Sequence, residues 1–163
     1  MSITFNADEI FEMAEEIEKN GAKFYRTAAK NTADKKIKQL LLDLAAMEDG
    51  HLKIFQEMRK QLTPLEKEQL VFDPDNQAAM YLRTMADGHG WEGKKNLSES
   101  LTGKEKIEDI LSSAINAEKN SVVFYVGLKD CVPARAGKDK IQNIITEELG
   151  HIAVLNRQLA DLK

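Results

Sequence analysis

A pattern of glutamate and histidine occurs twice in this chain, and the two copies lie 100 residues apart. Each copy has a single glutamate followed, 30 residues later, by a Glu-x-x-His motif. The copies consist of Glu18, Glu48 and His51, and of Glu118, Glu148 and His151. All six residues fall on apolar stripes with steps of three and four residues, which are typical of helices packed in a bundle. The repeat therefore predicts four helices that bring these side chains to one level.

The same spacing defines the expected helices and the domain that they form. Within one domain, residues 1–163, we expect helices at about 7–30, 34–61, 103–130 and 134–162. Short loops inside each pair make two antiparallel hairpins. Residues 63–102 connect the hairpins by a long crossover, with a short helix expected at 76–86. The predicted fold class is all-α, a four-helix bundle with a long crossover between its second and third helices.

Local signals also mark the ends of these helices. Asn6 with Glu9, and Thr102 with Glu105, have the spacing of capping boxes, in which side chain and backbone satisfy each other at a helix start. We therefore expect the first and third helices to begin directly after Asn6 and Thr102. The inward stripe of the fourth helix continues to Leu162.

Four carboxylates and two imidazoles at one level of a bundle form a site for two metal ions. Residues three apart share a helix face, so the two members of each Glu-x-x-His can bind the same metal. Glu48 and Glu148 can also bridge both metals, whereas Glu18 and Glu118 would each reach one. Without metal, these carboxylates would repel one another in apolar surroundings. Carboxylate with imidazole suits iron and manganese, and zinc is an alternative.

Four other residues have side chains that bind metals or form hydrogen bonds in many proteins, and each has a simpler structural interpretation. Tyr25 and Tyr125 each follow the single glutamate of their copy by seven residues. Each is either a core tyrosine with a satisfied hydroxyl or a hydrogen-bond partner of a ligand carboxylate. His89 lies in Asp-Gly-His-Gly-Trp, and we expect a solvated turn residue there rather than a ligand. Cys131 is expected to be a small residue, buried or half-buried, at a helix end.

Composition narrows the class of protein. The net charge of −4 is mild and mixed along the chain, so it does not predict a nucleic-acid surface. No apolar run approaches the length that spans a membrane. Residues 1–9 lack the pattern of a secretory signal. The single cysteine excludes an internal disulfide and a four-cysteine metal site within these residues. We expect a cytoplasmic protein.

Four segments resemble the rubrerythrin branch of the ferritin-like superfamily. Glu-Lys-Asn-Gly-Ala-Lys-Phe-Tyr at 18–25 and Glu-Lys-Asn-Ser-Val-Val-Phe-Tyr at 118–125 are similar to its first and third ligand helices. Met-Glu-Asp-Gly-His at 47–51 and Glu-Leu-Gly-His at 148–151 are similar to its second and fourth. The resemblance implies a ferritin-like bundle with a non-haem di-iron site that reduces peroxide or dioxygen. The bridging residues Glu48 and Glu148 would then be the ones on which catalysis depends most.

The chain also departs from the rubrerythrin pattern. Rubrerythrins carry a rubredoxin domain with four cysteines, so the resemblance implies a separate electron donor here, such as a rubredoxin-like protein. Ser121 stands where rubrerythrins have a further glutamate, and His151 where a second glutamate is common. The set of four glutamates and two histidines is similar to that of bacterioferritins. A ferroxidase or iron-handling protein, and a non-enzymatic metal-binding protein, are therefore the alternatives. We expect a homodimer, in which the long connection would permit exchange of hairpins.

Overall fold

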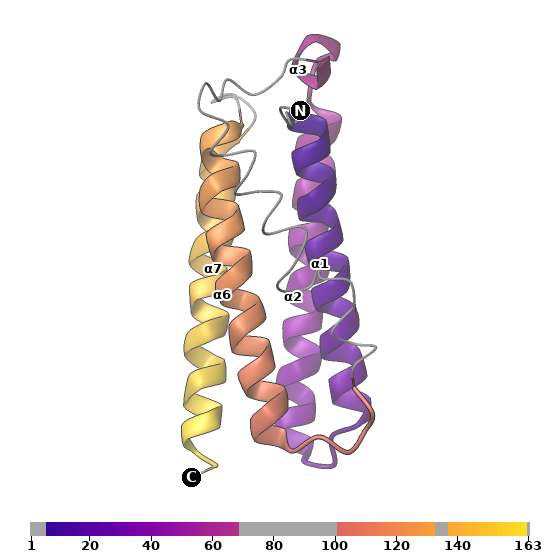
Figure 1. Ribbon diagram of the computed structural model, residues 1–163, viewed down its shortest axis with the longest axis vertical. Coiled ribbons are helices and arrows are strands. Elements are labelled where there is room, and N and C mark those ends of the chain that lie inside the picture. The colour runs from indigo at the N-terminus through magenta and orange to yellow at the C-terminus, as the bar shows by residue number, and fades with distance from the viewer. Residues whose placement is uncertain (1–5, 69–100, 133–136, 163) are drawn as a thin grey trace, which may run out of the picture.

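The structure, a computed structural model, describes residues 6–68, 101–132 and 137–162. Its helices are α1 (Ala7–Lys30), α2 (Lys35–Lys60), α3 (Pro64–Glu68), α6 (Ile107–Cys131) and α7 (Lys138–Ala160). The hairpins α1–α2 and α6–α7 stand side by side, and together they form the predicted all-α four-helix bundle (Figure 1). His89 and the short helix expected at 76–86 lie outside the described residues.

The two hairpins are placed so that α2 and α6 run in the same direction (Figure 1). The neighbours of two glycines show the same arrangement. A Cβ atom on Gly103, just before α6, would lie 3.6 Å from the side chain of Asn31 in the α1–α2 turn. A Cβ atom on Gly137, just before α7, would lie 3.2 Å from Met58 near the end of α2. Thus α2 ends and α6 begins at opposite ends of the bundle, as a long crossover requires.

The start of α1 is the capping box expected from the sequence. The Asn6 side chain accepts a hydrogen bond from the backbone N–H of Glu9, and the Glu9 carboxylate accepts one from the backbone N–H of Asn6, each at 2.9 Å. Asp34 caps α2 in a similar way, because its carboxylate accepts from the backbone N–H groups of Lys36 and Ile37. The helices that supply the first copy of the pattern are thus fixed at their starts.

The prediction for the start of α6 was wrong by four residues. Thr102 and Glu105 do interact, since the Glu105 carboxylate accepts hydrogen bonds from the backbone N–H and the hydroxyl of Thr102, each at 2.6 Å. These hydrogen bonds lower the pKa of Glu105 to about 2. Gly103, however, adopts a left-handed conformation with φ of 81°, so the pair closes a turn instead of a helix. The helix begins only at Ile107.

The limits of α7 also differ from the prediction. Gly137 has φ of 104° and the helix begins after it, at Lys138, whereas the sequence suggested 134. The helix ends at Ala160, so Leu162 no longer follows the inward stripe and is 38% exposed. The expectation that Leu162 packs inward was therefore wrong.

The stripes of the four long helices meet along the axis of the bundle and form its core. Aromatic side chains are concentrated there: the ring centroids of Phe11 and Phe55 are 6.3 Å apart, and those of Phe55 and Tyr125 are 5.1 Å apart. Phe24 and Phe124 pack edge-on against the adjacent tyrosines. The predicted metal ligands are buried in the same core. No described helix is long and apolar enough to cross a membrane.

Candidate metal centre

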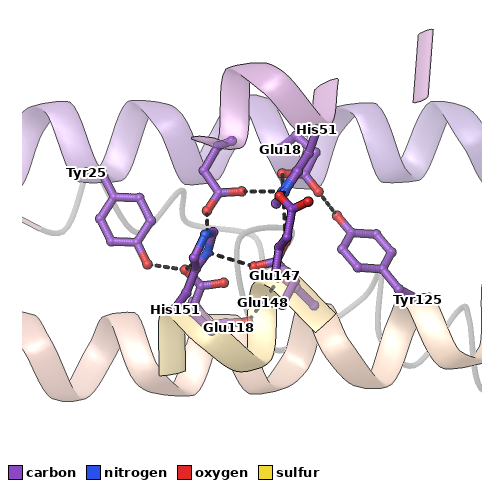
Figure 2. A network of polar contacts seen from close by, with 11 residues as sticks. Glu18, Tyr25, His51, Glu118, Tyr125, Glu147, Glu148 and His151 are labelled. Atoms are coloured by element: carbon purple, nitrogen blue, oxygen red, sulfur yellow. Dashed lines mark hydrogen bonds and ion pairs between the residues drawn. The ribbon is translucent and has the colours of Figure 1, made fainter. Parts of the chain in front are cut away.

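The bundle brings all six predicted ligands together (Figure 2). Each long helix contributes at the same level: α1 and α6 one glutamate each, and α2 and α7 a Glu-x-x-His each. None of the six residues is more than 4% exposed. Charged side chains are rarely buried to this extent unless they are paired or bind a metal.

The cluster divides into two overlapping sets of potential ligands. One set is Glu18, Glu48, His51 and Glu148, and the other is Glu48, Glu118, Glu148 and His151. Within each set the candidate ligand atoms all lie within 4.8 Å of one another. Glu48 and Glu148 belong to both sets, which is the arrangement that bridging carboxylates need. The imidazole rings of His51 and His151 are nearly parallel, with an interplanar angle of 19° and centroids 5.8 Å apart.

The Nδ1 atoms of both histidines face the carboxylates. His51 Nδ1 lies 3.1 Å from Glu148 Oε1, and 3.5 Å from Glu18 Oε2 and from Glu48 Oε2. His151 Nδ1 lies 3.0 Å from the other oxygen of Glu148, Oε2. One carboxylate, that of Glu148, therefore turns one oxygen toward each imidazole.

Unpartnered polar atoms show that this cluster is incomplete by itself. Among the described residues, the buried side-chain nitrogen and oxygen atoms that lack a hydrogen-bond partner all belong to it. They are Glu18 Oε2, Glu48 Oε1, both carboxylate oxygens of Glu148, His51 Nδ1, and both ring nitrogens of His151. A buried polar atom without a partner costs about 1–3 kcal/mol. Carboxylate oxygens and imidazole nitrogens that converge without partners fit divalent metal ions, and among them iron or manganese.

Burial and mutual repulsion distribute protons unevenly over the metal-free cluster. Burial, together with the charge of Glu48, raises the pKa of both Glu18 and Glu118 well above the ordinary value. Burial also opposes ionisation of Glu48 and Glu148, but the two imidazoles close to their carboxylates favour the charged form, and both pKa values are lowered. In the metal-free cluster, the two glutamates shared by both sets therefore ionise more readily than Glu18 and Glu118.

The two tyrosines resolve an alternative that the sequence left open. The Tyr25 hydroxyl donates a hydrogen bond to Glu118 Oε1, and the Tyr125 hydroxyl donates one to Glu18 Oε1 (Figure 2). Each hydroxyl thus reaches the glutamate of the opposite hairpin. Burial raises the pKa of both tyrosines, so their hydroxyls stay protonated and act as donors. In Glu18, this hydrogen bond occupies one carboxylate oxygen and leaves the other facing His51.

One residue of the site was missed in the sequence. The carboxylate of Glu147, on α7, lies 2.9 Å from His51 Nε2 (Figure 2). Its side chain is half-exposed and lies on the polar face of the helix, outside the apolar stripe by which the ligands were predicted. Only its position directly before the ligand Glu148 could have drawn attention to it. Ser121, by contrast, adds no ligand, because its hydroxyl donates to the backbone carbonyl of Ala117 at 3.2 Å.

Comparison with known proteins agrees with this architecture. Residues 9–106, more than half of the chain, match the family model described as Rubrerythrin. A crystal structure from Thermotoga maritima, described as a ferritin-like diiron-carboxylate protein, superimposes with a TM-score of 0.79 at 24% sequence identity, covering 100% of both chains. That likeness shows the ferritin-like fold. A search of curated proteins gave no match. On the family match, the chain belongs to the rubrerythrin family.

Proposed function

We propose that this protein is a di-iron oxidoreductase of rubrerythrin type, which reduces peroxide or dioxygen with electrons from a separate donor. The observation that carries the proposal is the pair of overlapping ligand sets, buried and short of hydrogen-bond partners, that share Glu48 and Glu148. Glu18 and His51 would complete one metal position, and Glu118 and His151 the other. When bound, two ferrous ions supply the electrons that an oxidant accepts.

The residues of the chain would hold and isolate these ions. Glu48 and Glu148 are kept ionised by their neighbours and so provide negative charge between the two positions. The tyrosine hydroxyls each fix one oxygen of an outer glutamate, which limits the orientations that the other oxygen can take. All six ligand residues are buried in the core of the bundle. These features supply a rigid and dry site, which is the contribution of the protein in metal-ion catalysis.

The electron donor is part of the proposal. The one cysteine of the 163 residues cannot build the four-cysteine iron site of rubredoxin. We therefore propose that a rubredoxin-like protein supplies the electrons. A cytoplasmic location and a homodimer are further parts of the proposal.

The test is stopped-flow oxidation of protein loaded anaerobically with two Fe(II) per chain. Peroxide should oxidise the site rapidly, and a reduced rubredoxin should then sustain peroxide consumption over many turnovers. Protein loaded with zinc, which has no redox chemistry, is the matched control. A single oxidation by dioxygen that ends in retained Fe(III) would instead assign the protein to iron handling. Zinc in protein purified from its own host, with no response to peroxide after iron loading, would assign it to non-enzymatic metal binding.

A further inference from the structure

The two metal positions have different outer surroundings although their ligands repeat. On one side, the Glu147 carboxylate contacts His51 Nε2 at 2.9 Å. On the other side, His151 Nε2 is buried, and no described residue gives it a hydrogen-bond partner. The 100-residue repeat explains the difference, since the position equivalent to Glu147 is Met47, whose thioether is at best a weak acceptor.

The contact with Glu147 determines how His51 can act as a ligand. A carboxylate accepts hydrogen bonds, so in the neutral ring that binds a metal it holds the proton on Nε2 and leaves the Nδ1 lone pair directed at the cluster. His51 Nδ1 is the atom that faces three carboxylates at 3.1–3.5 Å. An outer carboxylate of this kind fixes ring orientation and increases the basicity of a metal-binding histidine. Nothing comparable orients His151 among the described residues.

We propose that the two metal positions are unequal and that Glu147, a positioning residue for His51, makes the His51 position bind its metal more tightly than the His151 position. This inference rests on the two-metal centre proposed above. Loss of such an outer partner lowers metal affinity about 10–100-fold, so the two dissociation constants should differ by about tenfold or more.

The surroundings of Glu147 allow a clean test. Its side chain is half-exposed and lies on the wall of an open groove of about 530 Å³ between α2 and α7, lined also by Glu57 and Lys140. Met47 is 41% exposed. Substitution at either position therefore leaves no cavity in the core, and the variants should fold.

The experiment is an anaerobic titration of metal-free protein with Co(II), followed by absorption and by competition with a chelator. Wild type should bind two Co(II) per chain in two resolved steps. Glu147→Ala should weaken binding at the His51 position about 10–100-fold and leave the His151 position unchanged, so that the gap between the two steps closes or their order reverses. Glu147→Gln keeps a hydrogen-bond acceptor, so it should weaken metal binding at the His51 position less than Glu147→Ala does. Met47→Glu, which places a carboxylate at the equivalent position, should strengthen the weak step. Glu57→Ala removes a charge from the same groove without touching His51 and should change neither step.

The possible results separate the inference from the function on which it rests. Two equal steps in wild type, or a Glu147→Ala effect no larger than that of Glu57→Ala, would overturn the inequality while leaving the two-metal centre intact. Weakening of both steps alike by Glu147→Ala would overturn the positioning role. Less than one Co(II) bound per chain would overturn the metal centre itself, and the proposed function with it.

Discussion

In the metal-free protein, the free energy of unfolding should fall as pH rises. In the metal-loaded protein, it should not show this fall. In the metal-free cluster, burial lowers the pKa of both imidazoles, but the attraction of the carboxylates at 3.0–3.5 Å outweighs it. They raise the pKa of His151 from 6.5 to about 12 and raise that of His51 as well. The folded protein therefore keeps protons that the unfolded chain loses above about pH 6.5. This stabilisation is complete below pH 6.5 and is lost as pH rises toward 12.

The magnitude follows from the number of protons. Each proton retained only by the folded state lowers the free energy of unfolding by about 1.4 kcal/mol per pH unit, so both imidazoles together give about 2.7 kcal/mol. For a chain of this size, 1 kcal/mol corresponds to about 2–4 °C in melting temperature. Glu18 and Glu118 act in the same direction, because their pKa values are also raised. Metal-bound ligands are deprotonated, so the loaded protein has no such protons to lose.

The assay is thermal unfolding followed by circular dichroism between pH 6.5 and 8.5, with chelator or with excess Mn(II). The melting temperature of the metal-free protein should fall by about 5–11 °C per pH unit when both imidazoles keep their protons. The gap to the loaded protein should widen accordingly. His151→Gln removes one of the two imidazoles and should reduce the slope. A metal-free melting temperature that stays constant or rises with pH, with metal loss confirmed by elemental analysis, would refute this distribution of protons.

Three further predictions concern individual side chains. Tyr25→Phe and Tyr125→Phe each remove one hydrogen bond to an outer glutamate and should weaken metal binding about 10–100-fold in chelator competition, and an unchanged affinity would show that these hydroxyls do not orient the ligands. Glu148→Ala removes a carboxylate shared by both sets, so it should weaken both metal positions and abolish peroxide-driven oxidation. Glu118→Ala should weaken only the His151 position, and tight binding of one metal by both variants would contradict the bridging role. Asn6→Ala removes the cap of α1 and should lower the free energy of unfolding by about 1 kcal/mol in denaturant titration, without changing metal content.

The sequence predicted the bundle well because its strongest signal is periodic. Apolar residues at steps of three and four specify which helix face is buried. The same residues form that face wherever the helix begins. Helix ends depend instead on single backbone conformations. Thr102 and Glu105 have the right side chains for a capping box, but the left-handed Gly103 between them turns the chain first. Leu162 matches the stripe, but the helix that would hold it inward ends at Ala160.

The candidate site was predictable for a related reason, and only in part. A charged residue on an apolar stripe is conspicuous, so the six residues that the bundle brings together stand out in the sequence. Whether they bind metal stays a prediction. The tyrosines could not be assigned, because a hydroxyl that crosses to the opposite hairpin has its partner 93 or 107 residues away.

Glu147 shows why the surroundings of a site are harder to read than its ligands. Ligands must lie on the buried stripe, so both copies of the repeat keep them. A residue that supports a ligand from outside can lie on the polar face, where a glutamate looks like any other solvated residue. Because the polar face is free to vary, the two halves of a repeated site can differ there without disturbing the bundle. Glu147 in one copy and Met47 in the other are such a difference. Glu147 is not a ligand itself but contacts the ligand His51. In a centre built from a repeat, unequal metal positions should therefore be sought among the residues next to the ligands.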